Sequence, residues 1–157
     1  MTGRATGRLC FAALFVPGLA CADPATLQLQ DAGGAVLAQL PMSAGAEICL
    51  RWAHSVTGGA VADCFENRSG TLTLTRSFLH DFAAGLGEVA GRGMLVSAQG
   101  GGYWIMGIDE ALPDNGLTLR AGSGHVGHRL TTADHDLALL DHVDRGARVR
   151  LQLNLTP

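Results

Sequence analysis

The sequence predicts an all-β protein, formed by a single small antiparallel β-sandwich or β-barrel of about 8–11 short strands. Apolar and polar residues alternate over short segments, which is the period of a half-buried strand. Turn-forming residues such as DAGG, NRSG and PDNG separate these segments at intervals of about 8–12 residues. The chain has 157 residues, of which 47% are hydrophobic, and this suits one domain with a buried core.

The strand pattern recurs along the whole chain after the first 25 residues. In chain order, the expected strands cover residues 26–30, 35–40, 47–54, 61–66, 71–78, 93–98, 103–108, 116–121, 128–132, 136–140 and 147–154. Residues 80–93 interrupt the pattern with the Gly- and Ala-rich sequence HDFAAGLGEVAGRG, for which we expect a loop that could include one helical turn.

Residues 1–22 have the features of a secretory signal peptide. Two arginines precede the short apolar segment LCFAALFVPGLA, and ACA at 20–22 fits a small-residue cleavage site. We therefore expect residues 23–157 to form a single exported β domain without a transmembrane segment. Lipid attachment at Cys21 is a less favoured alternative, because Gly18 stands where such sites usually carry a larger aliphatic residue.

The charge balance argues against nucleic acid as a partner. The 14 acidic residues outnumber the 11 basic ones, even before the two arginines of the predicted leader are removed. Binding to nucleic acid needs a basic surface, which this composition does not supply.

The cysteine count indicates one disulfide. Cys10 and Cys21 fall in the predicted leader, so Cys49 and Cys64 remain as a pair in the exported domain. An even pair in an oxidising compartment favours a bridge. Closing a loop of about 15 residues, this bridge would contribute about 3 kcal/mol to the free energy of unfolding in the chain-entropy account.

The bridge also predicts the register of a hairpin. If Cys49 faces Cys64 in an antiparallel pair, Leu50 faces Asp63. The connection is then centred between positions 56 and 57, and a tight turn at the two following glycines is incompatible with the bridge.

Alternation along the first strand of this hairpin predicts which side chains face the core. Four of them share the apolar face, namely Ile48, Leu50, Trp52 and His54. Asp63 faces the same way, whereas the bridge lies on the outer face with Glu47, Arg51 and Glu66.

An inward carboxylate needs a partner, because an unpaired buried charge is costly. In this register Gly59 faces His54. Asp63 lies four residues beyond Gly59 on the returning strand, and therefore about 13 Å from His54. A bulge or a folded-back loop would have to bring the two together. Otherwise we expect Asp63 to pair with an arginine or a backbone N–H of another strand, and His54 to be a hairpin-tip residue.

Several quoted segments carry a resemblance. They are HSV at 54–56, LTLTRSFLHDFAAGL at 72–86, YWIMGI at 103–108, LTLRAGSGHVGHRL at 117–130 and VRLQL at 149–153. Over residues 45–154 the chain resembles the domain of unknown function 1850 family. The resemblance implies a small exported bacterial protein of the periplasm, associated with TAXI-type TRAP transporters, and it implies no activity.

Two short elements carry the most specific part of the resemblance. His54, Ser55 and Val56 match the first element, and Asp63 stands where the family pattern has Glu. The second element is matched by Phe82, Ala84, Gly85 and Leu86, with Ala83 where Gly is expected. The shorter acid changes the reach of the carboxylate by one methylene group.

The residue types of a hydrolytic triad are present, but their arrangement argues against one. Ser55 directly follows His54, so on a strand the two side chains face opposite ways, whereas a nucleophile must lie within hydrogen-bond reach of its base. The G-x-S-x-G motif of a nucleophile elbow is also missing from the sequence. We expect no catalytic serine.

The six histidines do not show the spacing of a metal site. His125 and His128 form HVGH, which places their rings on opposite faces of a strand, and neither H-E-x-x-H nor paired C-x-x-C motifs occur. We therefore expect no metal and no cofactor. His128 is the most interesting of the histidines, because it begins an expected strand within the resembling segment.

These observations lead to a single functional expectation. We predict a monomeric, non-catalytic periplasmic accessory protein of a TRAP-type (TAXI) solute transport system. Its partner would be the permease or the solute-binding protein, or it would bind solute itself. The candidate binding residues are His54, Ser55, Asp63, Phe82, Gly85 and His128. The alternative is a small-molecule or metal-dependent periplasmic enzyme that uses His54 and Asp63.

Overall fold

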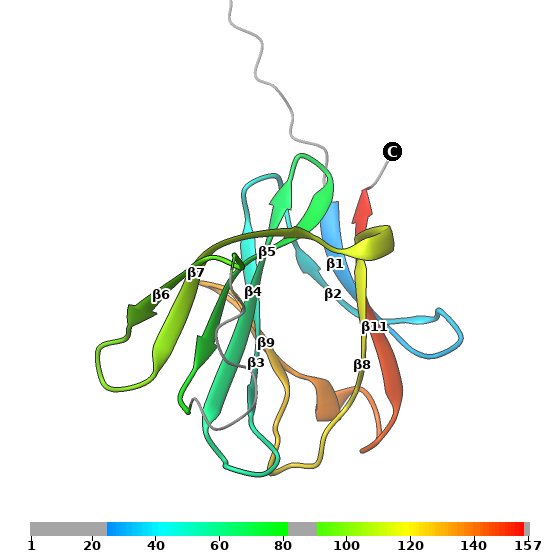
Figure 1. The fold of residues 1–157 in the computed structure, drawn as a ribbon. Helices are drawn as coiled ribbons and strands as arrows, with labels where there is room; N and C mark the ends of the chain where they lie inside the picture. Colours follow the sequence, from blue (N-terminus) through cyan, green and yellow to red (C-terminus); the bar gives the residue numbers. More distant parts are fainter. Residues whose placement is uncertain (1–24, 82–90, 156–157) are drawn as a thin grey trace, which may run out of the picture.

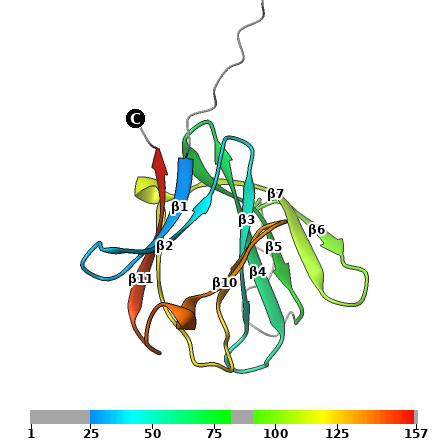
Figure 2. The same ribbon diagram turned by 180° about the vertical axis from the view of Figure 1, so that it is seen from behind.

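Two antiparallel sheets packed face to face form the domain in the computed structural model (Figures 1 and 2). The structure describes residues 25–81 and 91–155. The predicted leader, with Cys21, and the candidate residues Phe82 and Gly85 lie outside these ranges. The sheets do not close into a barrel, so of the two predicted architectures the sandwich is confirmed.

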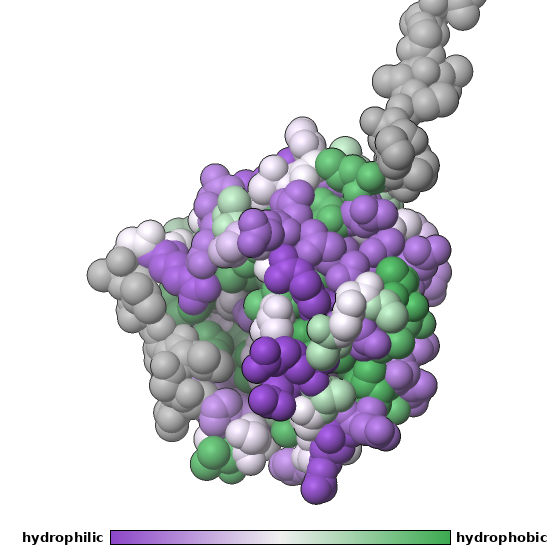
Figure 3. Space-filling model, turned by 90° about the vertical axis from the view of Figure 1, so that its right-hand side faces the viewer, coloured by the Kyte–Doolittle hydropathy of each residue, from purple (hydrophilic) through white to green (hydrophobic). Residues whose placement is uncertain are grey.

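The smaller sheet has four strands in the order β2-β1-β11-β8. Their bounds are β2 (Val36–Pro41), β1 (Ala25–Gln30), β11 (Arg148–Leu155) and β8 (Gly116–Arg120). Seen from outside, a hydrophilic area extends over the middle of this side of the molecule (Figure 3). It agrees with the outward-facing glutamines of β1 and β11, which hydrogen-bond along their own strands.

The larger sheet has seven strands in the order β10-β9-β3-β4-β5-β7-β6. Their bounds are β10 (Asp136–Ala138), β9 (Arg129–Thr131), β3 (Glu47–Ala53), β4 (Ala60–Arg68), β5 (Thr71–Leu79), β7 (Tyr103–Ala111) and β6 (Met94–Ser97). Two short 3-10 helices complete the described elements, η2 (Pro113–Asn115) and η3 (Leu139–Asp141).

Every expected strand has a counterpart within a few residues of its predicted bounds. The expected strand 136–140 ends early, because the chain curls into η3 at Leu139, whose N–H donates to the carbonyl of His128. The core lies between the sheets and consists of the inward residues of each alternating pattern. Leu27, Leu151, Ile48 and Leu130 are among those that are fully buried.

The predicted hairpin register and disulfide are confirmed. β3 and β4 pair with Cys49 opposite Cys64 and Leu50 opposite Asp63, and the two sulfurs are bonded. His54 and Gly59 close the connecting loop through the His54 N–H, which donates to the Gly59 carbonyl at 2.8 Å. The loop is therefore centred between positions 56 and 57, as the bridge requires.

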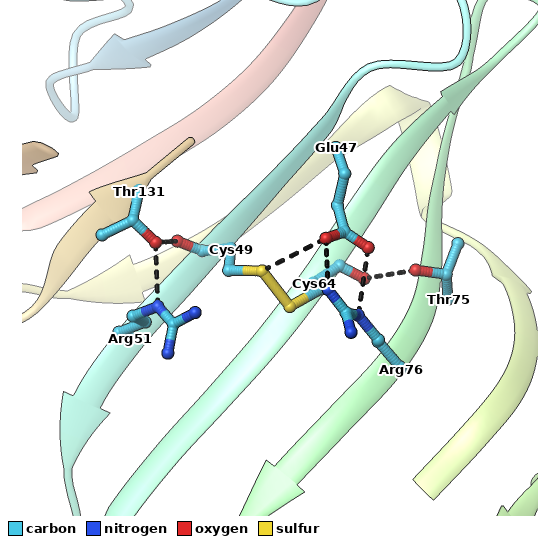
Figure 4. Close-up of polar contacts among 7 residues, drawn as sticks. All are labelled: Glu47, Cys49, Arg51, Cys64, Thr75, Arg76 and Thr131. Atoms are coloured by element: carbon cyan, nitrogen blue, oxygen red, sulfur yellow. Dashed lines mark hydrogen bonds and ion pairs between the residues drawn. A yellow bond between two sulfur atoms is a disulfide. The ribbon is translucent and has the colours of Figure 1, made fainter. Parts of the chain in front are cut away.

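The bridge lies on the outer face of the larger sheet, but its sulfurs are buried (Figure 4). Arg76 is directly opposite Cys64 on β5, and its guanidinium donates to both carboxylate oxygens of Glu47, at 2.5 and 3.1 Å. This exposed ion pair lies beside the bridge and contributes to its shielding from solvent.

Candidate functional site at the hairpin end of the sandwich

Two loops meet at one end of the sandwich, at the bottom of Figures 1 and 2. Residues 54–59 connect β3 to β4, and residues 121–128 connect β8 to β9. The Ala53 N–H donates to the Val126 carbonyl at 2.8 Å, which joins the second loop to the strand that begins the first. The two loops therefore form one continuous end surface, to which the HSV element and His128 both belong.

His54 is built into the first loop through its ring. Its Nδ1 atom accepts hydrogen bonds from the N–H groups of Val56 and Thr57, at 3.4 and 3.3 Å. A nitrogen that accepts cannot carry a proton, so the neutral ring is the Nε2–H tautomer. His54 thus closes the loop from inside and keeps one polar edge, the Nε2–H, for another contact.

His128 is held in the same way in the second loop. The Gly122 N–H donates to its Nδ1 atom at 3.0 Å, and the imidazole centroid lies 5.9 Å from the Trp52 ring. Burial lowers the pKa of His128 below its ordinary value, so the ring is neutral at about pH 7. The end of the sandwich therefore presents two imidazoles whose Nδ1 atoms are both occupied by backbone donors.

Asp63 lies deeper, on the inward face of the larger sheet. Its Oδ1 atom accepts a hydrogen bond from the Ser77 hydroxyl on β5, at 2.5 Å. Burial raises the pKa of Asp63, while the Ser77 hydrogen bond and, more weakly, the positive charge of Arg92 oppose that rise. The partner is a hydroxyl, and not the arginine or backbone N–H that we expected, because Ser77 stands directly opposite Asp63 in the β4–β5 register.

The structure does not bring His54 and Asp63 together. His54 is opposite Gly59, so Asp63 lies four residues further along β4, at about 13 Å. Each side chain also has its own hydrogen-bond partner. Ser55 is exposed in the loop, next to the tip residue Val56, whose side chain is 85% exposed. This arrangement positions surface contacts but does not assemble an acid–base pair.

One group of side chains in the described ranges has the proximity that a metal site needs, formed by Glu47, Cys49 and Cys64. Its sulfurs are bonded to each other, so they offer no thiolate. The carboxylate of Glu47 forms an ion pair with Arg76. We assign no metal to this group.

Sequence reasoning overlooked three residues at this end. Trp52 packs half-buried against the core, as expected, but its contact with the His128 ring, which is tilted by 36° at 5.9 Å between centroids, was not foreseen. Arg51 on β3 and Phe78 on β5 face outward on either side of β4 and line a surface pocket. An outward Phe in an alternating strand was the one available signal, because outward positions normally carry polar residues.

The fold and the loop end define a small disulfide-bonded β-sandwich with two histidines at one end whose rings accept hydrogen bonds from backbone N–H groups. The family described as a domain of unknown function (DUF1850) matches residues 48–139, and the chain belongs to this family. The match extends from β3 to η3 and includes both loops of the candidate site. No curated protein and no solved structure matches the chain. Among the described residues, no helix is long and apolar enough to cross a membrane.

Proposed function

We propose that this protein is an exported, monomeric, non-catalytic accessory of a TRAP-type (TAXI) solute transport system, and that its loop end docks on a transporter subunit. The observation that carries the docking surface is the conformation of residues 54–59. An apolar residue, Val56, projects from a loop that the His54 ring holds from inside. The link to transport is the expectation that accompanies the family resemblance.

The disulfide supports the compartment in this proposal. Bridges between cysteines persist in oxidising environments such as the bacterial periplasm and are rare in the cytosol. Cys49 and Cys64 are both buried and bonded, as expected of a structural bridge in an exported protein.

The separation of the polar candidates supports a binding role over an enzymatic one. General acid–base catalysis needs the acid or base within hydrogen-bond reach of the reacting group. His54 and Asp63 lie about 13 Å apart on the sheet, and Asp63 is occupied by Ser77. The enzyme alternative would require both to act on one substrate from these positions.

The preformed loop supports docking on energetic grounds. Binding costs free energy for every loop that must be ordered, and a loop already in its bound conformation avoids that cost. Val56 supplies an apolar contact, and the Nε2–H of His54 supplies a hydrogen-bond donor beside it. A protein partner with an apolar hollow and an adjacent acceptor would complement this tip.

The proposal can be tested by capturing partners of the tagged mature protein from detergent-solubilised membranes of a bacterium that encodes it. Wild type is compared with Val56→Asp, which places a charge at the tip. Val36→Asp is the matched control, because Val36 is also exposed, at 49%, but lies on β2 of the other sheet. We expect a transporter subunit with wild type and Val36→Asp and not with Val56→Asp. Recovery with all three, or with none, would reject the loop end as the docking surface.

A further inference from the structure

A pocket of about 430 Å³ opens on the outer face of the larger sheet, beside the two loops. Arg51, Ala62 and Phe78 are directly opposite one another on β3, β4 and β5. The short alanine between two long side chains leaves a hollow between Arg51 and Phe78. The second loop, at residues 125–127, lines the end of this hollow.

One wall of the pocket carries a positive charge without a matching acid. The Arg51 Nε atom donates to the Thr131 hydroxyl at 2.9 Å, which is a neutral partner. The terminal nitrogens of its guanidinium have no dashed contact to the other residues drawn in Figure 4. Within the described ranges, no carboxylate forms an ion pair with Arg51.

A second arginine adds to the local excess of positive charge. Arg129 is directly opposite Arg51 on β9, and like charges in this position destabilise a sheet. Asp136 is bonded to the Arg129 guanidinium at 2.6 Å, so the nearby carboxylate is already in use. An anion at Arg51 would reduce the repulsion between the two guanidinium groups.

The opposite wall is apolar and fixed. The Phe78 ring lies 5.2 Å from the Trp104 ring on β7, and this contact holds it against the sheet. Ala62 forms the floor and is buried, and Val126 contributes from the loop. Among the described residues, the pocket therefore combines a guanidinium without an acidic partner at one side with an apolar surface at the other.

We propose that this pocket binds a small organic monocarboxylate. The carboxylate contacts the terminal nitrogens of Arg51, because two parallel N–H groups match its two oxygens. The apolar part of the ligand lies over Ala62 against Phe78. The volume agrees with the lower range of small-molecule sites, which is about 300–1,000 Å³. This inference does not depend on the proposed docking role, since Val56 does not line the pocket.

The test uses the isotope-labelled mature protein and follows backbone amide shifts by NMR during titration with 3-methylbutanoate. 3-Methylbutanamide, which has the same shape without the charge, and inorganic phosphate are titrated in parallel. We expect saturable shifts around Arg51, Ala62 and Phe78 with the carboxylate alone. Arg51→Gln should weaken binding by at least about tenfold, as expected for loss of a charged hydrogen-bond partner.

Three further variants make the result specific. Arg51→Lys keeps the charge without the planar fork and should bind more weakly than wild type but more tightly than Arg51→Gln. Phe78→Ala should weaken binding of the carboxylate by removing the apolar wall. Arg148→Gln, at the exposed first position of β11 in the other sheet, is the matched control and should bind as wild type does.

Several results would overturn the inference. These are the absence of saturable shifts with 3-methylbutanoate, equal shifts with the amide, stronger binding of phosphate, and an unchanged affinity of Arg51→Gln. A well-dispersed spectrum of Arg51→Gln shows that the variant is folded, so loss of binding is then attributable to the guanidinium. Arg51→Gln should still capture the transporter subunit, whereas Val56→Asp should still bind the carboxylate, so failure of either proposal is seen separately.

Discussion

The Ser77 hydroxyl donates a hydrogen bond of 2.5 Å to Asp63 Oδ1, in an inward row of the larger sheet that is otherwise apolar. Leu50 is the neighbour of Asp63 on one side, and Ile105 follows Ser77 on the other. A carboxyl group in such surroundings loses hydration, and one hydroxyl only partly replaces it.

This position predicts a pH-dependent stability. Burial raises the pKa of Asp63 above its ordinary value of 3.8, so the folded state holds the proton more tightly than the unfolded state. The resulting stabilisation is complete below about pH 3.8 and is lost as the pH rises through the raised pKa. Asp63→Asn does not titrate, so its melting temperature should rise relative to wild type from acid to neutral pH. A pH-independent difference would contradict the raised pKa.

The same pair predicts different outcomes for two substitutions of Asp63. Asn keeps an acceptor for the Ser77 hydroxyl, whereas Ala leaves that buried hydroxyl unpaired. We expect Asp63→Ala to be less stable than Asp63→Asn by about 1–2 kcal/mol in urea unfolding at acid pH. Equal stability of the two variants would mean that the hydrogen bond contributes nothing.

His128 predicts a pH dependence of opposite sign. Burial lowers the pKa of His128 in the folded state below its ordinary value of 6.5. Its contribution to stability is therefore present above about pH 6.5 and is lost as the pH falls through the lowered pKa. His128→Gln retains an acceptor for the Gly122 N–H but does not titrate, so its melting temperature should fall less than that of wild type on acidification. His142→Gln controls for the loss of one imidazole at an exposed position.

The disulfide predicts a large stability effect. The bonded cysteines are separated by 15 residues in the sequence, for which the chain-entropy account gives about 3 kcal/mol. We expect the double variant Cys49→Ala, Cys64→Ala to lose about 2–4 kcal/mol in urea unfolding without reductant. A reductant added to the unfolded protein should lower the midpoint of wild type and leave that of the double variant unchanged. An equal midpoint for both proteins without reductant would show that the bridge does not stabilise the domain.

The hydrogen bonds of the His54 ring predict an effect of substitution that is confined to the loop at residues 54–59. Its Nδ1 atom accepts from residues two and three positions ahead, which is the pattern that an Asn side chain makes in an Asx-turn. His54→Ala should speed hydrogen exchange at the Val56 and Thr57 amides and weaken capture of the transporter subunit, with the fold intact. His54→Asn should restore slow exchange. Fast exchange in wild type would show that the ring does not hold the loop.

Local patterns were sufficient for the strands and for the hairpin register. Alternation reports which face of a strand is buried, and one covalent bond between Cys49 and Cys64 leaves a single antiparallel pairing for the residues between them. Such patterns could not distinguish a sandwich from a barrel, because that difference depends on whether the edge strands of the two sheets meet.

Most contacts of the candidate site could also not be predicted from local sequence patterns. The sequence alone determined an all-β domain, the hairpin with its bridge, and the inward position of Asp63, since each depends on spacing along one short segment. Only the tertiary structure decided that Ser77 is the partner of Asp63, that Trp52 lies beside His128, and that Arg51 and Phe78 enclose a pocket. These contacts join segments far apart in the chain, and the neighbour that a strand acquires across a sheet is set by packing of the whole domain.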